Sequence, residues 1–196
     1  AALRLLLEEE EPDRAAMEGE IYRIEQYVEF ALQYQRLEGG HKDLVFAHYS
    51  LESIVKKALK KTGVLFRRTK LALELGNLQT DVLTDEKWLV FVLEQVLTNA
   101  VKYTRKGKIS IYLDPEKEKT LVVEDTGMGI RPEDLPRIFE WGYTGYNGRI
   151  KNRATGIGLA LCRQTMEMLG HRISAKSEPG KGTSVHMVRR LGNQEG

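Results

Sequence analysis

The longest stretch of helical periodicity in the chain, residues 85–104, constrains the fold more than any other segment. Its apolar residues recur every three or four positions, which is the pattern of an amphipathic helix. Two β-type runs follow it, "KISIYL" at 108–113 and "TLVVED" at 120–125, and they are close enough to form a hairpin. A long helix next to a hairpin with a buried face predicts that helix and sheet pack in separate layers.

The rest of the main segment continues this alternation of periods. The predicted elements are helices at 50–68 and 156–169 and strands at 70–75, 172–178 and 183–190. Strands outnumber crossover helices, and each helix is amphipathic. We therefore expect a two-layer α/β sandwich, with a mixed sheet that has helices on one face.

The first 40 residues differ from the rest in charge and in pattern. They carry four arginines against ten acidic residues, whereas the remainder is basic. Two neighbouring apolar rows predict a helix over roughly 13–38 that packs in a bundle, and residues 1–12 look like the end of another helix. An alternative is a helical extension that only caps the main domain. The predicted division is a shortened helical hairpin at 1–38, a linker at 39–42, a main domain at 43–192 and a tail at 193–196.

Composition narrows the class of protein. The basic main domain favours an anionic partner, although charge alone does not distinguish a nucleotide from a nucleic acid. The single cysteine, Cys162, excludes a disulfide within the chain and fits a reducing compartment. No apolar run approaches the ~18 residues that a membrane helix needs. We expect a domain that works in water.

The segment "VEDTGMGI" ends a buried strand with a carboxylate and then two glycines. Asp125 can accept a hydrogen bond from an exocyclic amine and so select adenine over guanine. Gly127 and Gly129 let the main chain pass close to a flat ring. Taken alone, the pattern is also typical of a hairpin end with turn glycines.

A polar stripe interrupts the longest predicted helix. Asn99 is followed by Lys102 and Tyr103 at spacings of three and four, so that all three project from one face. An amide oxygen can bind Mg²⁺, a lysine can neutralise phosphate, and an aromatic ring can pack on a base or ribose. The alternative is that these residues form the solvent-exposed polar face of an ordinary amphipathic helix.

A third segment, "TGIGLALC", places small residues at the start of a predicted helix. Thr155, Gly156 and Gly158 would expose backbone amides where a helix favours phosphate oxygens, although a capping loop without ligand has the same sequence. Residues 141–156 before it hold four glycines and three cations but no acidic residue. We interpret them as a mobile lid over a triphosphate, with a basic surface loop as the alternative.

These segments are similar, in order, to the five signature boxes of the GHKL superfamily, and specifically to the catalytic ATP-binding domain of bacterial sensor histidine kinases. The boxes are "EQVLTNAVKYT", "EDTGMGI", "LPRIFEWGYTG", "TGIGLAL" and "GKGTSV". The resemblance covers residues 42–190 and implies the left-handed ATP-binding sandwich of that superfamily. Within it, "GYTGYNGR" looks most like the intramembrane-sensing kinases that answer bacitracin and related antimicrobial peptides.

The resemblance implies roles residue by residue, with ATP and Mg²⁺ as cofactors. Asn99 matches the asparagine that holds Mg²⁺, Asp125 matches the aspartate that reads adenine, and Phe139 matches an aromatic residue that packs the base of the lid. Asn99 and Lys102 are the expected catalytic residues. The positions that match nucleotide-binding residues are Gln95, Asn99, Lys102, Tyr103, Asp125, Gly127, Gly129, Ile130, Tyr143, Arg149, Lys151, Arg153, Thr155, Gly156, Gly158, Leu159 and Thr183.

One position favours a kinase over a hydrolase. Relatives that hydrolyse ATP carry a glutamate four residues before the Mg²⁺ asparagine, where this chain has Gln95. Glu94 is one position earlier and turned away by about 100° on a helix. The resemblance therefore implies a histidine kinase. A GHKL ATPase or serine kinase is the alternative, and a non-catalytic binding scaffold is the third hypothesis.

The histidine that accepts the phosphoryl group is not expected in this chain. The family's hairpin carries it in a His-(Asp/Glu)-x-(Lys/Arg) string, and none of His41, His48, His171 and His186 begins one; the last two fall in predicted strands. We expect the chain to bind ATP without phosphorylating itself. The resemblance implies a response-regulator receiver domain and a second copy as partners, and no nucleic acid. It also implies a cytoplasmic domain, attached to a bacterial membrane only through a part N-terminal to this chain.

Overall fold

The computed structural model describes residues 44–67, 69–117, 119–146 and 155–188, together with isolated helical residues between 17 and 35. Those isolated residues agree with the predicted helix over 13–38. The rest of that helix, the linker at 39–42, the tail at 193–196 and the predicted nucleotide contacts Arg149, Lys151 and Arg153 lie outside the described residues. The division into domains therefore remains a prediction.

The main segment alternates strands and helices in the order that the periodicity predicts. The sequence pattern did not indicate two short strands: β1, which precedes α3, and β3, which precedes α4. The elements are β1 (Ala47–Ser50), α3 (Leu51–Arg67), β2 (Ala72–Leu75), β3 (Asp81–Thr84), α4 (Glu86–Tyr103), β4 (Lys108–Leu113), β5 (Thr120–Asp125), the 3₁₀ turn η2 (Leu135–Arg137), α6 (Gly158–Met168), β6 (Arg172–Glu178) and β7 (Gly182–Val188).

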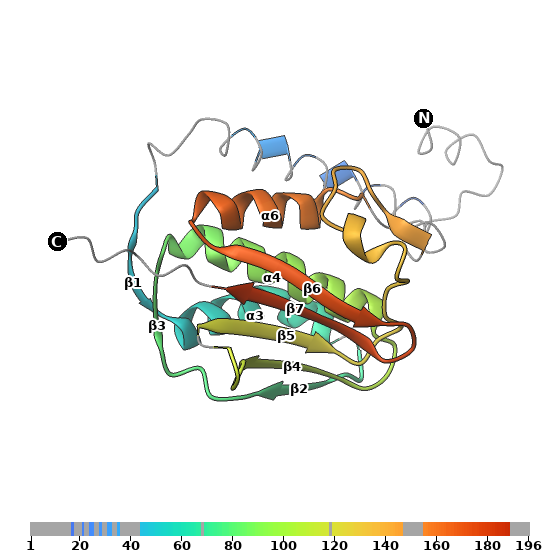
Figure 1. Cartoon of the computed structure of the whole chain (residues 1–196), viewed down its shortest axis with the longest axis horizontal. Coiled ribbons are helices and arrows are strands. Elements are labelled where there is room, and N and C mark those ends of the chain that lie inside the picture. The colour runs from blue at the N-terminus through green and yellow to red at the C-terminus, as the bar shows by residue number, and fades with distance from the viewer. Residues whose placement is uncertain are drawn as a thin grey trace.

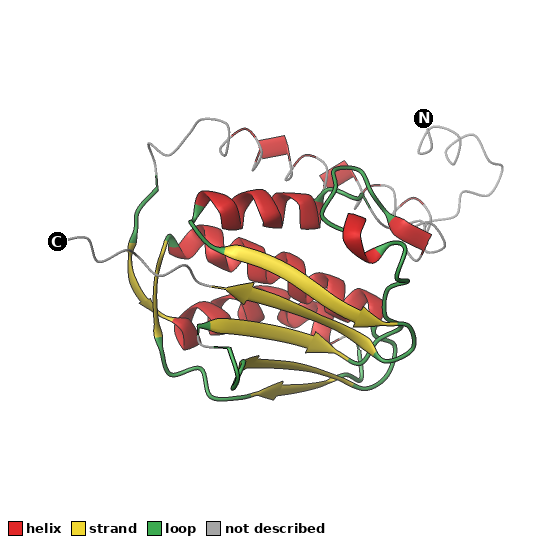
Figure 2. Ribbon diagram, viewed as in Figure 1, coloured by secondary structure: helices red, strands yellow, loops and turns green. Residues whose placement is uncertain are grey.

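The strands form a five-stranded mixed sheet in the order β2-β4-β5-β7-β6. The β2–β4 pair is parallel, and the other three pairs are antiparallel. Helices α3, α4 and α6 cover one face of this sheet (Figure 1), so the protein is the expected two-layer α/β sandwich (Figure 2). β1 and β3 make a separate antiparallel ribbon, which four-residue strands are too short to reveal by alternation.

Helix α4 lies at the centre of the helical layer. Its start is fixed by Asp85, whose Oδ1 accepts hydrogen bonds from the backbone amides of Lys87 (3.0 Å) and Trp88 (3.3 Å). Leu93 and Leu97 are fully buried in the core between helices and sheet. The helix ends at Thr104, whose backbone turns to an extended conformation with ψ at 116°. The polar stripe of the helix is thereby brought to the end of the sheet.

The central strands β4 and β5 carry most of the sheet's share of the core, whereas β2 at the edge is exposed. On the inner face Ile109, Ile111 and Leu121 are at most 3% exposed. His171 corrects one detail of the sequence analysis: it precedes β6 instead of lying in a strand, and it is buried beside Thr84. None of the helices in the described ranges combines the length and apolarity that a membrane crossing requires.

Candidate functional site

The last residue of β5 is a buried carboxylate held in one orientation. Asp125 is 9% exposed. Its Oδ1 accepts hydrogen bonds from the backbone amide of Gly127 (2.8 Å) and the hydroxyl of Thr104 (3.3 Å). Burial raises the pKa of this carboxyl, although those two hydrogen bonds and the backbone amide of Thr183 oppose the rise. A fixed, partly desolvated acceptor of this kind can discriminate a ligand that presents an N–H group.

The glycines after Asp125 fit a space that the protein's own backbone restricts. A Cβ on Gly127 would lie 2.6 Å from both Asp125 Oδ1 and the carbonyl oxygen of Tyr103. Gly129 has φ at +69°, and its Cβ would lie 2.1 Å from the carbonyl oxygen of Glu178. These contacts give a structural reason for both glycines, in addition to the predicted approach to a flat ring. At these two glycines the loop backbone packs directly against the end of α4 and the β6–β7 turn.

A serine that the sequence analysis did not identify joins this loop to the sheet. The Ser177 hydroxyl donates to the carbonyl oxygen of Gly182 (2.7 Å) and lies 2.9 Å from the hydroxyl of Thr183. It accepts a hydrogen bond from the backbone amide of Ile130 (2.8 Å). Thr183 is opposite both Asp125 and Ser177 in the strand register. The sequence predicts a hairpin over 172–190, but only the strand register shows that Ser177 lies opposite Thr183.

The predicted stripe on α4 lies at the same end of the sheet. Gln95, Asn99, Lys102 and Tyr103 are all half-buried, and the Lys102 Nζ lies 5.1 Å from the centroid of the Tyr103 ring. Burial raises the pKa of Tyr103. The carbonyl oxygen of Tyr103 accepts a hydrogen bond from the backbone amide of Met128 (3.2 Å). The end of the stripe is thus bonded directly to the glycine loop.

Glu94 faces the opposite way. Its Oε1 lies 2.6 Å from the Nζ of Lys61 on α3, and only 21% of its side chain is exposed. This pairing agrees with the prediction that Glu94 turns away from the stripe that carries Gln95 and Asn99. Within the described ranges, no three His, Cys, Asp or Glu side chains gather in a way that could hold a metal ion. Asn99 suits a Mg²⁺ ion that takes most of its other ligands from phosphate and water.

The start of α6 offers backbone donors. Helix α6 begins at Gly158, and its N-cap residue, Ile157, makes no side-chain cap hydrogen bond to the first turn. The backbone amide of Ile157 donates to the Thr155 hydroxyl (3.3 Å). Gly156 has φ at +71°, and its carbonyl oxygen accepts a hydrogen bond from the amide of Gly142 (2.9 Å). An uncapped helix start of this kind is suited to phosphate oxygens. Leu159, in the first turn, is half-buried.

Two aromatic residues have structural partners, one just before the predicted lid at 141–156 and one within it. Phe139 is 8% exposed and belongs to the core, as expected for a residue that packs the base of the loop. The Tyr143 hydroxyl donates a hydrogen bond to the buried carboxylate of Asp134. Asp134, like Thr104, is a further residue that the sequence analysis did not identify. Figure 1 shows the end of β5, the β6–β7 turn, the end of α4 and the start of α6 at one end of the molecule.

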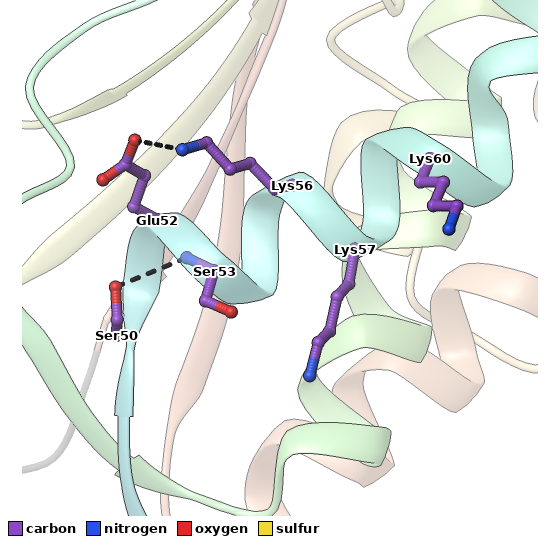
Figure 3. Close-up of a pocket in the computed structure, with 6 residues that line it drawn as sticks. All are labelled: Ser50, Glu52, Ser53, Lys56, Lys57 and Lys60. Atoms are coloured by element: carbon purple, nitrogen blue, oxygen red, sulfur yellow. Dashed lines mark hydrogen bonds and ion pairs between the residues drawn. The ribbon is translucent and has the colours of Figure 1, made fainter.

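A separate surface hollow lies over α3, far along the chain from these segments. It measures about 360 Å³ and is lined by Ser50, Glu52, Ser53, Lys56, Lys57 and Lys60. Figure 3 shows its lysines pointing in different directions, with Lys56 turned to Glu52 at 2.6 Å. Lys57 pairs with Glu86, also at 2.6 Å. Side chains that diverge and are already ion-paired do not form a convergent ligand site, and none of the predicted site residues lines it.

Comparisons with known proteins show the family of the chain. The histidine kinase-, DNA gyrase B- and HSP90-like ATPase family matches residues 84–192. The sensor protein BceS of Halalkalibacterium halodurans is 36% identical over 190 residues, which is 95% of this chain and 57% of BceS. The sensor histidine kinase YxdK of Bacillus subtilis is 34% identical over 187 residues, which is 92% of this chain and 57% of YxdK. The chain thus spans less than two thirds of the length of these curated relatives.

Solved structures share the fold at lower identity. The histidine kinase AdeS of Acinetobacter baumannii superimposes with a TM-score of 0.71 at 22% identity, over 97% of this chain and 94% of that chain. ShkA, solved at full length in complex with AMPPNP, has a TM-score of 0.70 at 20% identity, over 91% of this chain and 38% of that chain. The catalytic domain of the histidine kinase ThkA has a TM-score of 0.58 at 21% identity, over 74% of this chain and 95% of that chain.

Proposed function

Because the chain belongs to the histidine kinase-, DNA gyrase B- and HSP90-like ATPase family, we propose that it is the ATP-binding catalytic part of a two-component sensor histidine kinase. It binds Mg-ATP at the end of the sheet where β5 and α4 terminate. From there it donates the γ-phosphoryl group to a histidine that is none of the four in this chain. The curated relatives are named sensor proteins and sensor histidine kinases, which supports this reading.

The observation that carries the proposal is the geometry of Asp125. Its carboxylate is buried, is oriented by Gly127 and Thr104, and lies between two glycines and a polar helix stripe. An adenine amino group can donate to this carboxylate. Gly127 and Gly129 let the loop that follows it pack closely against the end of α4 and the β6–β7 turn. Ser177 links Thr183 and Ile130 to each other by hydrogen bonds next to this carboxylate. This arrangement supports recognition of the base at this end of the site.

The other end of the site supports binding of phosphates. The backbone amides at the start of α6 and the cation of Lys102 complement negative charge, and Asn99 supplies an oxygen for Mg²⁺. When bound, Mg²⁺ neutralises charge on the phosphate oxygens during transfer. The chain's own residues hold the nucleotide in place and orient the γ-phosphoryl group. Phosphoryl transfer needs little more than such positioning and charge stabilisation.

The arrangement around α4 favours transfer to histidine over hydrolysis. Hydrolysis needs a base that orients and activates water, and the position expected for it holds Gln95. The neighbouring Glu94 is paired with Lys61 and faces α3. A histidine acceptor is nucleophilic when neutral and requires less help from a base. A GHKL ATPase or serine kinase is therefore less well supported.

The partners follow from the same proposal. Sensor kinases work with response regulators and as dimers, so we propose that the longer protein pairs through its helical hairpin and passes the phosphoryl group to a receiver-domain aspartate. We also propose that this part works in the bacterial cytoplasm. In that arrangement, only a segment N-terminal to this chain contacts the membrane.

Calorimetric titration of the chain with ATP, with and without Mg²⁺, tests the proposal. We expect binding that Mg²⁺ strengthens, and an Asn99→Ala variant that loses this Mg²⁺ dependence while it keeps Mg²⁺-independent binding. Transfer is tested by adding the chain and radiolabelled ATP to a hairpin that carries the acceptor histidine, taken from BceS. A chain that binds no ATP, or that hydrolyses ATP steadily without labelling the hairpin, would exclude the kinase assignment.

A further inference from the structure

Asp134 lies in the segment that leads to η2, outside the residues assigned to nucleotide binding. We propose that Asp134 is a positioning residue, which holds segment 141–146 and thereby sets the phosphate-binding amides at the start of α6. This inference rests on the proposed function, because it assigns a role in binding the phosphates of the same nucleotide.

The carboxylate of Asp134 binds one short segment through both of its oxygens. It is 6% exposed. Its Oδ1 accepts the hydrogen bond from the Tyr143 hydroxyl, and its Oδ2 accepts a hydrogen bond from the backbone amide of Tyr146 (3.0 Å). Between these contacts lie Thr144 and Gly145, and a Cβ on Gly145 would lie 3.2 Å from Asp134 Oδ2. Both oxygens of one buried carboxylate therefore bind the same turn of chain.

Two arginines also hold this segment, by contacts with the rings of Tyr143 and Tyr146. The guanidinium carbon of Arg137 lies 4.1 Å from the centroid of the Tyr143 ring. That of Arg131 lies 3.4 Å from the centroid of the Tyr146 ring. Cation–π contacts at such distances hold each ring over a side chain of the 131–137 segment. The tyrosines are thus fixed at the hydroxyl or backbone by Asp134 and at the ring by an arginine.

Segment 141–146 in turn contacts the start of α6. The backbone amide of Gly142 donates to the carbonyl oxygen of Gly156 (2.9 Å). A Cβ on Gly156 would lie 2.5 Å from the carbonyl carbon of Gly142 and 2.8 Å from the backbone nitrogen of Tyr143. The two backbones are therefore in direct contact, and a shift of Gly142 must move Gly156 and the amides that follow it. A chain of bonded or packed groups runs from Asp134 through Tyr143 and Gly142 to Gly156.

The physical consequence is preorganisation of the phosphate end alone. If the carboxylate is removed, the free segment 141–146 can adopt several positions, and a bound phosphate must then order it at a cost in affinity. The base end does not depend on this contact, since Asp125 is held by Gly127 and Thr104. A loss of Asp134 should therefore weaken ligands that carry phosphates and spare a ligand that has only the base and ribose.

The test compares ATP with adenosine on the full chain. Asp134→Ala should weaken ATP binding about tenfold, which corresponds to the loss of one to two buried hydrogen bonds, and should leave adenosine affinity within twofold of wild type. Asp134→Asn should recover most of the loss, because its amide oxygen can accept from the Tyr146 amide while its NH₂ group donates to the Tyr143 oxygen. A fold defect would not distinguish the two ligands.

Two further variants keep the result decisive. Gly156→Ala disturbs the same contact without touching Asp134 and should lower the ATP-to-adenosine affinity ratio in the same direction. Glu52→Ala is the control: its carboxylate pairs with Lys56 on α3, which takes no part in this attachment, so the ratio should not change. The inference about Asp134, but not the proposed function, would be overturned by equal losses of affinity for ATP and adenosine. It would also be overturned if Asp134→Asn bound ATP as weakly as Asp134→Ala. Failure of the wild-type chain to bind ATP would overturn the proposed function together with it.

Discussion

Replacing Asp125 by asparagine should lower ATP affinity without lowering the stability of the folded protein, because the buried negative charge serves binding and not folding. An asparagine can keep its carbonyl oxygen at the Oδ1 position, where it still accepts from Gly127 (2.8 Å) and Thr104 (3.3 Å). Its NH₂ group then replaces the other oxygen and presents a donor to the donor of an adenine. A hydrogen bond to a charged group contributes about 1.5–3 kcal/mol, so ATP affinity should fall about 10- to 150-fold.

The stability of the nucleotide-free protein should move the other way. Burial raises the pKa of the Asp125 carboxyl above its ordinary value, so the folded protein holds this proton more tightly than the unfolded chain does. The ionised group therefore lowers stability as the pH rises from the ordinary carboxyl pKa through the raised one, and the deficit persists above that. At pH 7 Asp125→Asn should melt at the same temperature as wild type or higher. Any such gain should shrink as the pH falls below about 4.

The assay is ATP titration by calorimetry beside thermal unfolding, with Asp114→Asn as control. Asp114 also accepts two backbone hydrogen bonds, from Glu116 (3.0 Å) and Lys117 (3.2 Å), but it follows β4 and not β5. The control should leave ATP affinity unchanged. In wild type, ATP affinity should decrease as acid protonates Asp125. Affinity within twofold of wild type for Asp125→Asn, or a loss of affinity matched by an equal loss of stability, would refute the reasoning.

Three other outcomes follow from single contacts. Gly129 and Gly170 have nearly the same φ, +69° and +70°, but an added Cβ would meet backbone only at Gly129, at 2.1 Å. In urea unfolding, Gly170→Ala should lower the free energy of unfolding by about 1–2 kcal/mol and Gly129→Ala by several kcal/mol. Equal losses would contradict this packing. Leu97→Ala should cost about 2–5 kcal/mol in the same assay, because Leu97 is fully buried, and a cost below about 1 kcal/mol would contradict its place in the core. Gln95→Glu should raise the rate of phosphate release from ATP, whereas Glu94→Gln should leave that rate unchanged; a fall in the rate with Glu94→Gln would refute the assignment of faces on α4.

Local patterns were enough to predict most elements of the main domain. In α4, α6, β4 and β5, the spacing of apolar residues along the sequence shows which face of each element is buried. The β1–β3 ribbon was missed because four residues make too short an alternation. Ser177 and Thr104 were missed for another reason: each bonds to a residue on a different element. Their role depends on strand register and on where α4 ends.

The sequence alone determined the kinds of group at the site, since a carboxylate after a buried strand, an amide within a helix and glycines at a helix start are chosen residue by residue. Only the tertiary structure decided how they are held. Gly127 lacks room for a side chain because the end of α4 lies against it, and Asp134 binds a turn nine to twelve residues further along the chain. Distances between backbones depend on the packing of whole layers, and no short stretch of residues encodes them.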